Sequence, residues 1–213
     1  MPGNPAKTGK AALRVHYRRI RAHVADRARV DALIVAGVLA LPEVARARLV
    51  MLYWPLVSRG EVDVRPLADA LVARGAVVGL PVLVAGAGPS LDVRRYASAE
   101  ALAAGPFGIL KPAAGAERLD PARLDVVVVP ALALGRDGSR IGYGGGYYDA
   151  FLATTAALRV GVAPHACLAE SLPAEAHDAR LDVLGTERET VRVETPGTPS
   201  GAAGPHNAGS DGP

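Results

Sequence analysis

The sequence predicts an α/β fold, in which helices cover a layered β-sheet, and three observations lead to that prediction. Segments with strand character alternate along the chain with segments of helical periodicity. The run LDVVVVPALAL, residues 124–134, is rich in valine and apolar on both faces, as a central parallel strand should be. Half of the 213 residues are hydrophobic but only 4% are aromatic, so the core must consist mainly of Ala, Val and Leu.

The N-terminal half carries helical patterns before and between its strands. Residues 10–41 show helical periodicity, with an apolar stripe at Leu13, Tyr17, Ile20 and Val24. A second helix is expected over residues 65–75, where a glycine ends it. Strand character is found in three segments, which are residues 48–54, 76–84 and 91–96.

The C-terminal half places a glycine-rich stretch directly after the candidate central strand. This stretch, GRDGSRIGYGGGYYDAFL, covers residues 135–152. A helical pattern resumes over residues 146–158, and short strands are expected at residues 159–163 and 181–187.

Composition restricts the class of protein and its compartment. The net charge of +3 is too small to indicate nucleic-acid binding by itself. The single cysteine, Cys167, excludes an internal disulfide framework, and no apolar run could form a signal core or span a membrane. We expect a soluble cytoplasmic protein.

The sequence also predicts the domain organisation. Residues 1–194 should form one domain, and residues 195–213 should form a disordered tail because they have no apolar content to bury.

Three consecutive glycines, residues 144–146, stand between a buried strand and a helix. That position is the carboxyl end of a sheet, where α/β proteins bind ligands, and successive glycine N–H groups can turn toward a phosphate there. The stretch is not a dinucleotide fingerprint, because Tyr147 stands where that motif needs its third glycine. We therefore expect phosphate binding, with a tight turn that caps a helix as the alternative.

The residues after the glycines extend this prediction. Tyr147 and Tyr148 could stack on a planar ligand, and Asp149 could either cap the helix or hold Mg²⁺. If HDARLD is helical, Asp178 and Asp182 stack on one face, with a capping or surface role as the alternative.

Lys10, Arg14, Arg18 and Arg21 recur at spacings of four, four and three, so they line one face of the first helix. An anion such as a polyphosphate would relieve their mutual repulsion, and a solvated basic face is the alternative. Glu61 lies in a strand-to-helix loop, where functional residues often collect.

Together these residues resemble the 5-formyltetrahydrofolate cyclo-ligase family, also called 5,10-methenyltetrahydrofolate synthetases. The hallmark of that family is D-x-x-G-x-R-[LI]-G-x-G-x-G-Y-Y-D, and residues 137–149 are similar to it, with Gly138 displaced by one position. The resemblance spans residues 10–188 and includes four further segments. These are Lys10 with Arg14, Glu61 to Asp63, Gly108 to Pro112, and the segment from Leu172 through His177 and Asp178 to Asp182.

The resemblance implies a three-layer α/β/α fold with a mostly parallel sheet, Rossmann-like and in a single domain. It also implies ATP- and Mg²⁺-dependent cyclisation of 5-formyltetrahydrofolate to 5,10-methenyltetrahydrofolate, through phosphorylation of the formyl oxygen and with release of ADP and phosphate. ATP and Mg²⁺ would be the cofactors and a small-molecule folate the partner. We expect a monomer that binds neither membrane nor nucleic acid.

The resemblance further implies residue roles. Arg140 and Tyr148 would be catalytic, and Asp149 and Asp178 would hold Mg²⁺ directly or through water. The residues binding ATP would be Lys10, Arg14, Arg140, Ile141, Gly142, Tyr143, Gly144, Gly145, Gly146, Tyr147 and Tyr148. The residues binding folate would be Trp54, Glu61, Tyr143, Gly144, Gly145, Gly146 and Tyr147, with Glu61 hydrogen-bonding the pterin.

Three positions depart from the family pattern. Lys111 stands where an acid or amide is usual, Ala150 replaces a common arginine, and Gly145 stands where some members have lysine. Two alternative functions remain open at this point. One is a non-catalytic nucleotide or RNA binder on the same scaffold, and the other is a ligase or kinase for another small molecule.

Overall fold

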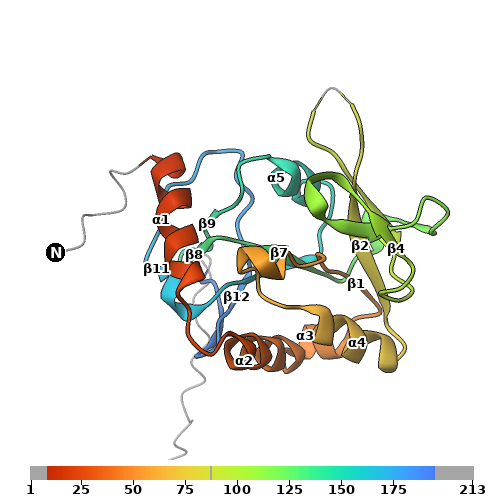
Figure 1. Ribbon diagram of the computed structural model, residues 1–213, viewed down its shortest axis with the longest axis horizontal. Helices are drawn as coiled ribbons and strands as arrows, with labels where there is room; N and C mark the ends of the chain where they lie inside the picture. The colour runs from red at the N-terminus through yellow and green to blue at the C-terminus, as the bar shows by residue number, and fades with distance from the viewer. Residues whose placement is uncertain (1–8, 87, 195–213) are drawn as a thin grey trace, which may run out of the picture.

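The computed structural model describes residues 9–86 and 88–194 and shows three layers, with a central sheet between two groups of helices (Figure 1). The predicted α/β/α fold class is therefore confirmed. The predicted tail, residues 195–213, lies outside the described residues.

The central sheet has eight strands, and its five middle strands run parallel. Its order is β13-β12-β10-β7-β1-β2-β3-β6, with antiparallel pairing only toward the two edges. The parallel strands are β1 (Leu49–Met51), β2 (Val77–Leu83), β7 (Val126–Pro130), β10 (Leu158–Val162) and β12 (Val183–Gly185). The antiparallel strands are β3 (Leu91–Arg95), β6 (Arg118–Leu119) and β13 (Thr190–Arg192).

Strand β7 confirms the predicted central strand. It lies between β1 and β10, and all four of its valines are buried. Successive side chains point to opposite faces of a sheet, so Val127 and Val129 pack toward α1 and α5 while Val126 and Val128 pack toward α2 and α4. Apolar residues at every position are needed because both faces are covered.

Strand β7 is shorter than the sequence predicts, because the apolar run covers residues 124–134. The chain leaves the central sheet after Pro130, which has no N–H group to donate to a ladder. The next strand, β8 (Ala133–Gly135), instead joins a separate small sheet with β9 (Arg140–Ile141) and β11 (Leu168–Ala169). The three consecutive glycines, residues 144–146, thus follow the β8–β9 hairpin rather than the central strand, which corrects the sequence prediction.

The helices lie on both sides of the central sheet (Figure 1). On one side are α2 (Arg27–Leu39), α3 (Pro42–Arg46) and α4 (Arg65–Ala73), and on the other are α1 (Lys10–Ala22) and α5 (Tyr147–Leu152). The segment 10–41 forms two helices rather than one, because Asp26 adopts a left-handed conformation with φ 45° and turns the chain. Helix α5 ends earlier than predicted, where the backbone and hydroxyl of Thr154 both donate to the carbonyl of Phe151.

A small hairpin of β4 (Leu102–Ala104) and β5 (Leu110–Pro112) lies near β2, at the opposite end of the molecule from α1 (Figure 1). Within the part of the chain that the structure describes, four short 3₁₀ helices lie in the connections, at Val57–Arg59, Pro106–Gly108, Pro121–Arg123 and His165–Cys167. No helix in the two described segments is long and apolar enough to cross a membrane.

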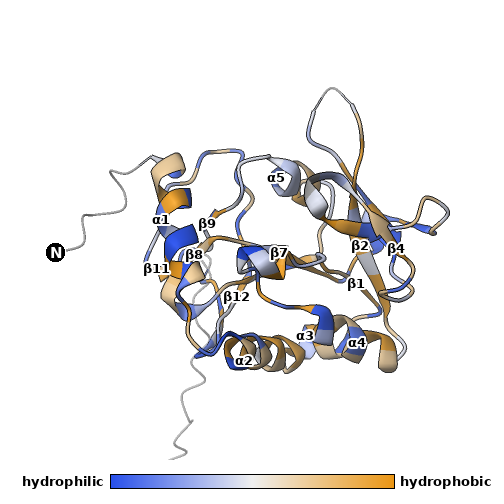
Figure 2. Cartoon of the chain, in the orientation of Figure 1, coloured by the Kyte–Doolittle hydropathy of each residue, from blue (hydrophilic) through white to orange (hydrophobic). Residues whose placement is uncertain are grey.

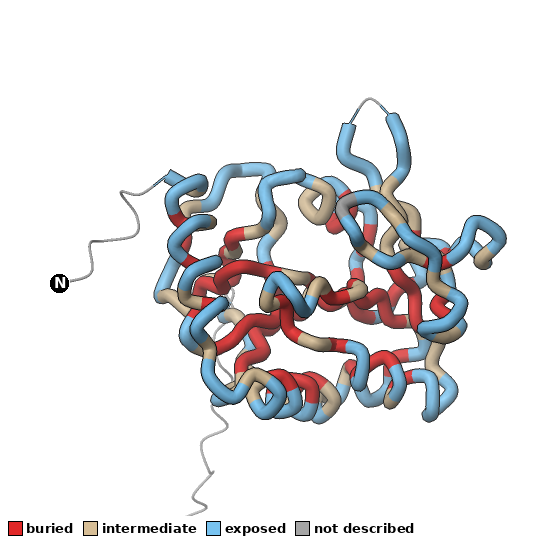
Figure 3. Tube along the Cα trace, viewed as in Figure 1, coloured by how far each residue is buried: buried red, intermediate tan, exposed pale blue. Residues whose placement is uncertain are grey.

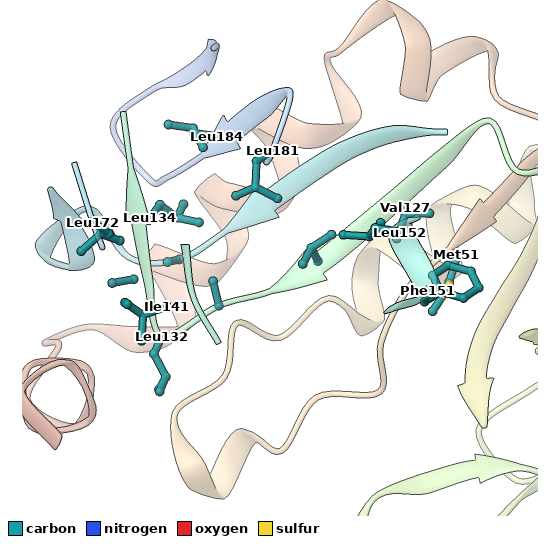
Figure 4. Packing of buried hydrophobic residues seen from close by; sticks show 14 of the residues in the cluster. Met51, Val127, Leu132, Leu134, Ile141, Phe151, Leu152, Leu172, Leu181 and Leu184 are labelled. Atoms are coloured by element: carbon teal, nitrogen blue, oxygen red, sulfur yellow. The ribbon is translucent and has the colours of Figure 1, made fainter. Parts of the chain in front are cut away.

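Apolar burial follows the layers. Buried residues concentrate along the sheet and the inward sides of the helices, while the outer turns are exposed (Figure 3). Strongly hydrophobic and strongly hydrophilic residues both occur on α1 (Figure 2). In Figure 4, Leu134 of the small sheet lies near Leu181 and Ile141 lies beside Leu132, and all four belong to one core that holds both sheets together.

The fold predicts that Gly161 in β10 does not tolerate a side chain. A Cβ atom there would collide with the side chains of Leu181 and Leu134, both buried and fixed in the core. Gly161→Ala should lower the free energy of unfolding by about 1–3 kcal/mol through overpacking. Denaturant titration of Gly161→Ala and Gly115→Ala tests this, since a Cβ at Gly115 meets nothing within 4 Å. Equal stabilities would contradict the packing.

Candidate active site

One cavity of about 560 Å³ gathers the residues that the sequence singled out. Its walls come from α1, the segment after β1, the β4–β5 hairpin, residues 140–149 and residues 175–178. Every residue predicted to bind ATP, folate or Mg²⁺ lines it, namely Lys10, Arg14, Trp54, Glu61, Arg140, Ile141, Gly142, Tyr143, Gly144, Gly145, Gly146, Tyr147, Tyr148, Asp149 and Asp178. The roles of these residues remain predictions.

Residues 142–146, called the glycine loop below, form one wall of the cavity. Gly144 has φ +96° and Gly146 has φ +70°, conformations that side chains rarely allow. A Cβ atom on Gly144 would also lie 3.2 Å from Cζ of Arg14. Because α5 has only six residues, the loop's own N–H groups and the nearby cations must supply most of the positive field for an anion.

Lys10, Arg14 and Arg140 line the same cavity as the glycine loop. Arg14 donates from Nε to the carbonyl of Gly142 at 3.1 Å. Arg140 has a side chain only 5% exposed, donates to the carbonyl of Ala179 and pairs with Asp149. Lys10 pairs with Asp178 at 2.6 Å, and also with Glu175 at 2.9 Å. The basic face of α1 therefore points into the cavity at Lys10 and Arg14, and Arg18 also lines it.

Arg21 departs from this pattern. It was grouped with the basic face, yet it is only 4% exposed and is not among the residues that line the cavity. Its guanidinium donates to the hydroxyl of Tyr143 at 2.7 Å and to the carbonyl of Arg59 at 2.6 Å.

The wall that faces the predicted folate side is built around a buried carboxylate. Glu61 is 7% exposed, and its Oε2 accepts a hydrogen bond from the backbone N–H of Leu56 at 2.8 Å. Trp54 lies beside Tyr96, with ring centroids 5.7 Å apart. Tyr53, which sequence reasoning missed because it is one of many apolar residues in a strand segment, also lines this wall.

The tyrosines after the glycines differ in environment. The hydroxyl of Tyr148 is buried and has no hydrogen-bond partner among the described residues. Burial, with the negative charge of Glu61, raises the pKa of Tyr148, so the phenol stays protonated and can donate to a ligand. Tyr147 packs below Gly145, where a Cβ would lie 2.8 Å from the ring.

Two of the positions that depart from the family pattern differ in their location. Lys111 lines the cavity, and Ala150 does not.

The predicted metal ligands lie in the cavity but are engaged by cations. In residues 9–86 and 88–194, no group of three or more His, Cys, Asp or Glu side chains could hold a metal ion alone. Among the described residues, Arg140 and the N–H of Ala179 donate hydrogen bonds to Oδ1 of Asp149, and Oδ2 is left available. Residues 177–182 are not helical, so Asp178 and Asp182 do not form the stacked pair considered above. Asp182 instead accepts from the N–H of Arg159 at 2.8 Å.

Comparison with known proteins gives consistent matches. The model of the 5-formyltetrahydrofolate cyclo-ligase family matches residues 6–187. The chain is 29% identical to a 5-formyltetrahydrofolate cyclo-ligase of Haemophilus influenzae, over 81% of this chain and 95% of the relative. It is 33% identical to that of Escherichia coli K12, over 68% and 81%. The 5,10-methenyltetrahydrofolate synthetase of Aquifex aeolicus superposes with a TM-score of 0.76 at 31% identity, covering 92% of this chain and 99% of that one.

The pairing of Lys10 with Asp178 predicts a pH dependence of stability. Burial alone would raise the pKa of Asp178, but the hydrogen bond and charge of Lys10, together with the N–H of Glu175 and the nearby His177, outweigh it and lower that pKa. The stability from this pair is therefore complete above the ordinary aspartate pKa of about 3.9 and is lost as the pH falls through the lowered value. Lys10→Met should cost about 1 kcal/mol at neutral pH and almost nothing in strong acid.

Thermal midpoints of the wild type and Lys10→Met between neutral and strongly acidic pH provide the test. Lys111→Met is the control, since Lys111 forms no ion pair with any described residue. A difference between wild type and Lys10→Met that does not change with pH would rule out the pair as its source.

Proposed function

The chain belongs to the 5-formyltetrahydrofolate cyclo-ligase family, and we propose that its cavity converts 5-formyltetrahydrofolate to 5,10-methenyltetrahydrofolate with ATP as the phosphoryl donor. Family membership makes it a ligase of folate and one-carbon metabolism. The main support for the proposed residue roles is the composition of the cavity. The same cavity is lined by the glycine loop, by the cations Lys10, Arg14 and Arg140, and by the buried Glu61. This favours the folate reaction over the two alternatives left open by the sequence.

The chemistry requires activation of the formyl oxygen, because an amide-like oxygen is a poor leaving group. The formyl oxygen attacks the γ-phosphorus of ATP, and the new P–O bond forms as the bond to ADP breaks. N10 then attacks the formyl carbon, the C–O bond breaks, and phosphate leaves with the proton from N10. Transfer of this kind depends on positioning and charge neutralisation rather than on a protein nucleophile.

The glycine loop and its cations fit the phosphoryl-transfer part of this scheme. Backbone N–H groups of residues 142–146 and the guanidinium of Arg140 can face the transferring phosphoryl group, whose charge spreads over its oxygens. Arg14 lies across the loop through its contacts with Gly142 and Gly144. Lys10 can exchange its carboxylate partners for phosphate oxygens when ATP binds.

The opposite wall fits the folate. The buried carboxylate of Glu61 can accept hydrogen bonds from pterin N–H groups, and its low exposure strengthens them. The protonated phenol of Tyr148 lacks a partner within the described residues, so it can donate to an oxygen of the reacting group.

The donor set is compatible with Mg²⁺ brought in by the nucleotide. Mg²⁺ usually takes one or two protein carboxylates and completes its octahedron with water and substrate phosphates. Asp149 has an oxygen available, and Asp178 would be released when Lys10 turns to phosphate. When bound, the ion would neutralise charge on the triphosphate.

The proposed activity is measured directly by mixing the protein with 5-formyltetrahydrofolate, ATP and Mg²⁺. The near-ultraviolet absorbance of the methenyl product should rise only when both ATP and Mg²⁺ are present. No rise despite tight ATP binding would contradict the proposal and leave the glycine loop as a phosphate site for another reaction.

Arg140 should be needed for turnover rather than for folding alone. Arg140→Ala is expected to lower kcat by about 10²–10³-fold, the usual loss when one charge-stabilising donor is removed. Arg123→Ala provides the matched control, because Arg123 is exposed and is not one of the residues that line the cavity. The test is to measure initial rates of both variants and of the wild type, with circular dichroism to confirm that each variant is folded. A kcat equal to that of the control would exclude Arg140 from catalysis.

A further inference from the structure

We infer that Arg21 is a positioning residue for this reaction, which fixes the loop carrying Glu61 to the glycine loop. The inference rests on the proposed function. It gives a different role to a residue that the sequence places only on the basic face of α1 and that lies outside the cavity.

Arg21 is an unusual buried cation. It is 4% exposed, and within the described segments no carboxylate pairs with its guanidinium. Its Nε is buried and has no acceptor among the described residues. A buried charge without an opposite charge is costly, because the loss of hydration is only partly repaid by neutral acceptors.

The two hydrogen bonds of Arg21 reach two different segments of the cavity wall. One nitrogen donates to the hydroxyl of Tyr143, at the second position of the glycine loop. The other donates to the carbonyl of Arg59, two residues before Glu61. Since Tyr143 and Arg59 both line the cavity while Arg21 does not, Arg21 can affect the reaction only through them.

The segment before Glu61 is shaped around the arginine. Gly60 has φ +70°, and a Cβ there would lie 3.4 Å from Cγ of Arg21, so the aliphatic part of the arginine packs against this glycine. Within the segment, the N–H of Gly60 donates to the carbonyl of Val57, and Glu61 accepts from the N–H of Leu56. The turn is therefore a closed unit, and Arg21 fixes its position relative to α1.

Arg21 contacts the ring of Tyr143 as well as its hydroxyl. The Arg21 guanidinium carbon lies 5.6 Å from the centre of the Tyr143 ring, so the cation contacts both the ring and its hydroxyl. The neighbouring residues Gly142 and Gly144 are contacted by Arg14. Two arginines of α1 thus set the position of the glycine loop, one from within the cavity and one from behind it.

Stability alone does not explain this arrangement. Replacing a buried charged group by an apolar residue of similar size is often neutral or stabilising. Folding alone therefore gives little reason to keep the arginine, and replacing a purely structural arginine would leave substrate affinity unchanged. A positioning arginine has the opposite signature, because displacement of reacting groups by about 1 Å can cost about 100-fold in rate.

A double-mutant cycle of Arg21→Met and Tyr143→Phe separates these cases. Each single change should lower kcat/KM by about 10- to 100-fold, with KM rising for both 5-formyltetrahydrofolate and ATP. The double variant should fall no further than Arg21→Met alone, within about two-fold, since Arg21→Met already breaks the contact that Tyr143→Phe removes. Arg19→Met is the matched control, because Arg19 is on the same helix, exposed and not a cavity residue.

Several results would overturn the inference. Unchanged KM values in Arg21→Met, with only a lower thermal midpoint, would mean a structural role. Losses that multiply in the double variant would mean that Arg21 does not act through Tyr143. If Arg21→Met fails to fold, the kinetics of Tyr143→Phe and Arg21→Lys provide the test instead. Wild-type kinetics in both variants would refute the positioning role of Arg21. Absence of activity in the wild type would instead refute the proposed function.

Discussion

Helix α1 packs across the glycine loop, and the cavity depends on that contact. Arg14 donates a hydrogen bond to the carbonyl of Gly142 and packs against Gly144. Arg21 donates to the hydroxyl of Tyr143, the residue between these two glycines. The loop follows the β8–β9 hairpin rather than a strand of the central sheet, so that sheet does not fix it directly. Its left-handed glycines would allow other conformations. The helix therefore selects one of them, and the same helix supplies the cation Lys10.

The charges of the cavity are arranged in pairs that a substrate can exchange. Lys10 is balanced by Asp178 and Glu175, and Arg140 by Asp149. A triphosphate with Mg²⁺ can replace both partners of each ion pair. The cationic side chains can then bind phosphate oxygens, and the carboxylates can bind the metal ion. Binding would then not leave an uncompensated charge in a partly buried site. Glu61 and Tyr148, which take no part in these pairs, are left for the folate and the reacting oxygen.

Local pattern predicted a layered α/β sheet, and the resemblance to the family predicted the residues of the cavity, but neither predicted the long-range contacts. Valines on both faces of β7 required cover on both sides, and the glycine loop with its flanking tyrosines marked the cavity correctly. Arg21 was misplaced because its acceptors lie 122 and 38 residues away, beyond any helical periodicity. The pairing of Asp178 with Asp182 failed for a related reason. Backbone N–H groups of Glu175 and Arg159 bind these carboxylates in a non-helical segment, and spacing cannot reveal that.

The central claim is that the cavity transfers phosphate to the formyl oxygen before the ring closes. The most direct measurement uses 5-formyltetrahydrofolate carrying an oxygen isotope label in its formyl group, turned over with unlabelled ATP in unlabelled water. Direct transfer places the label in the released phosphate, one atom for each methenyl product, and mass spectrometry of the phosphate detects it. Released phosphate without the label, in amounts equal to the product, would mean that ATP is hydrolysed by water and would contradict the mechanism.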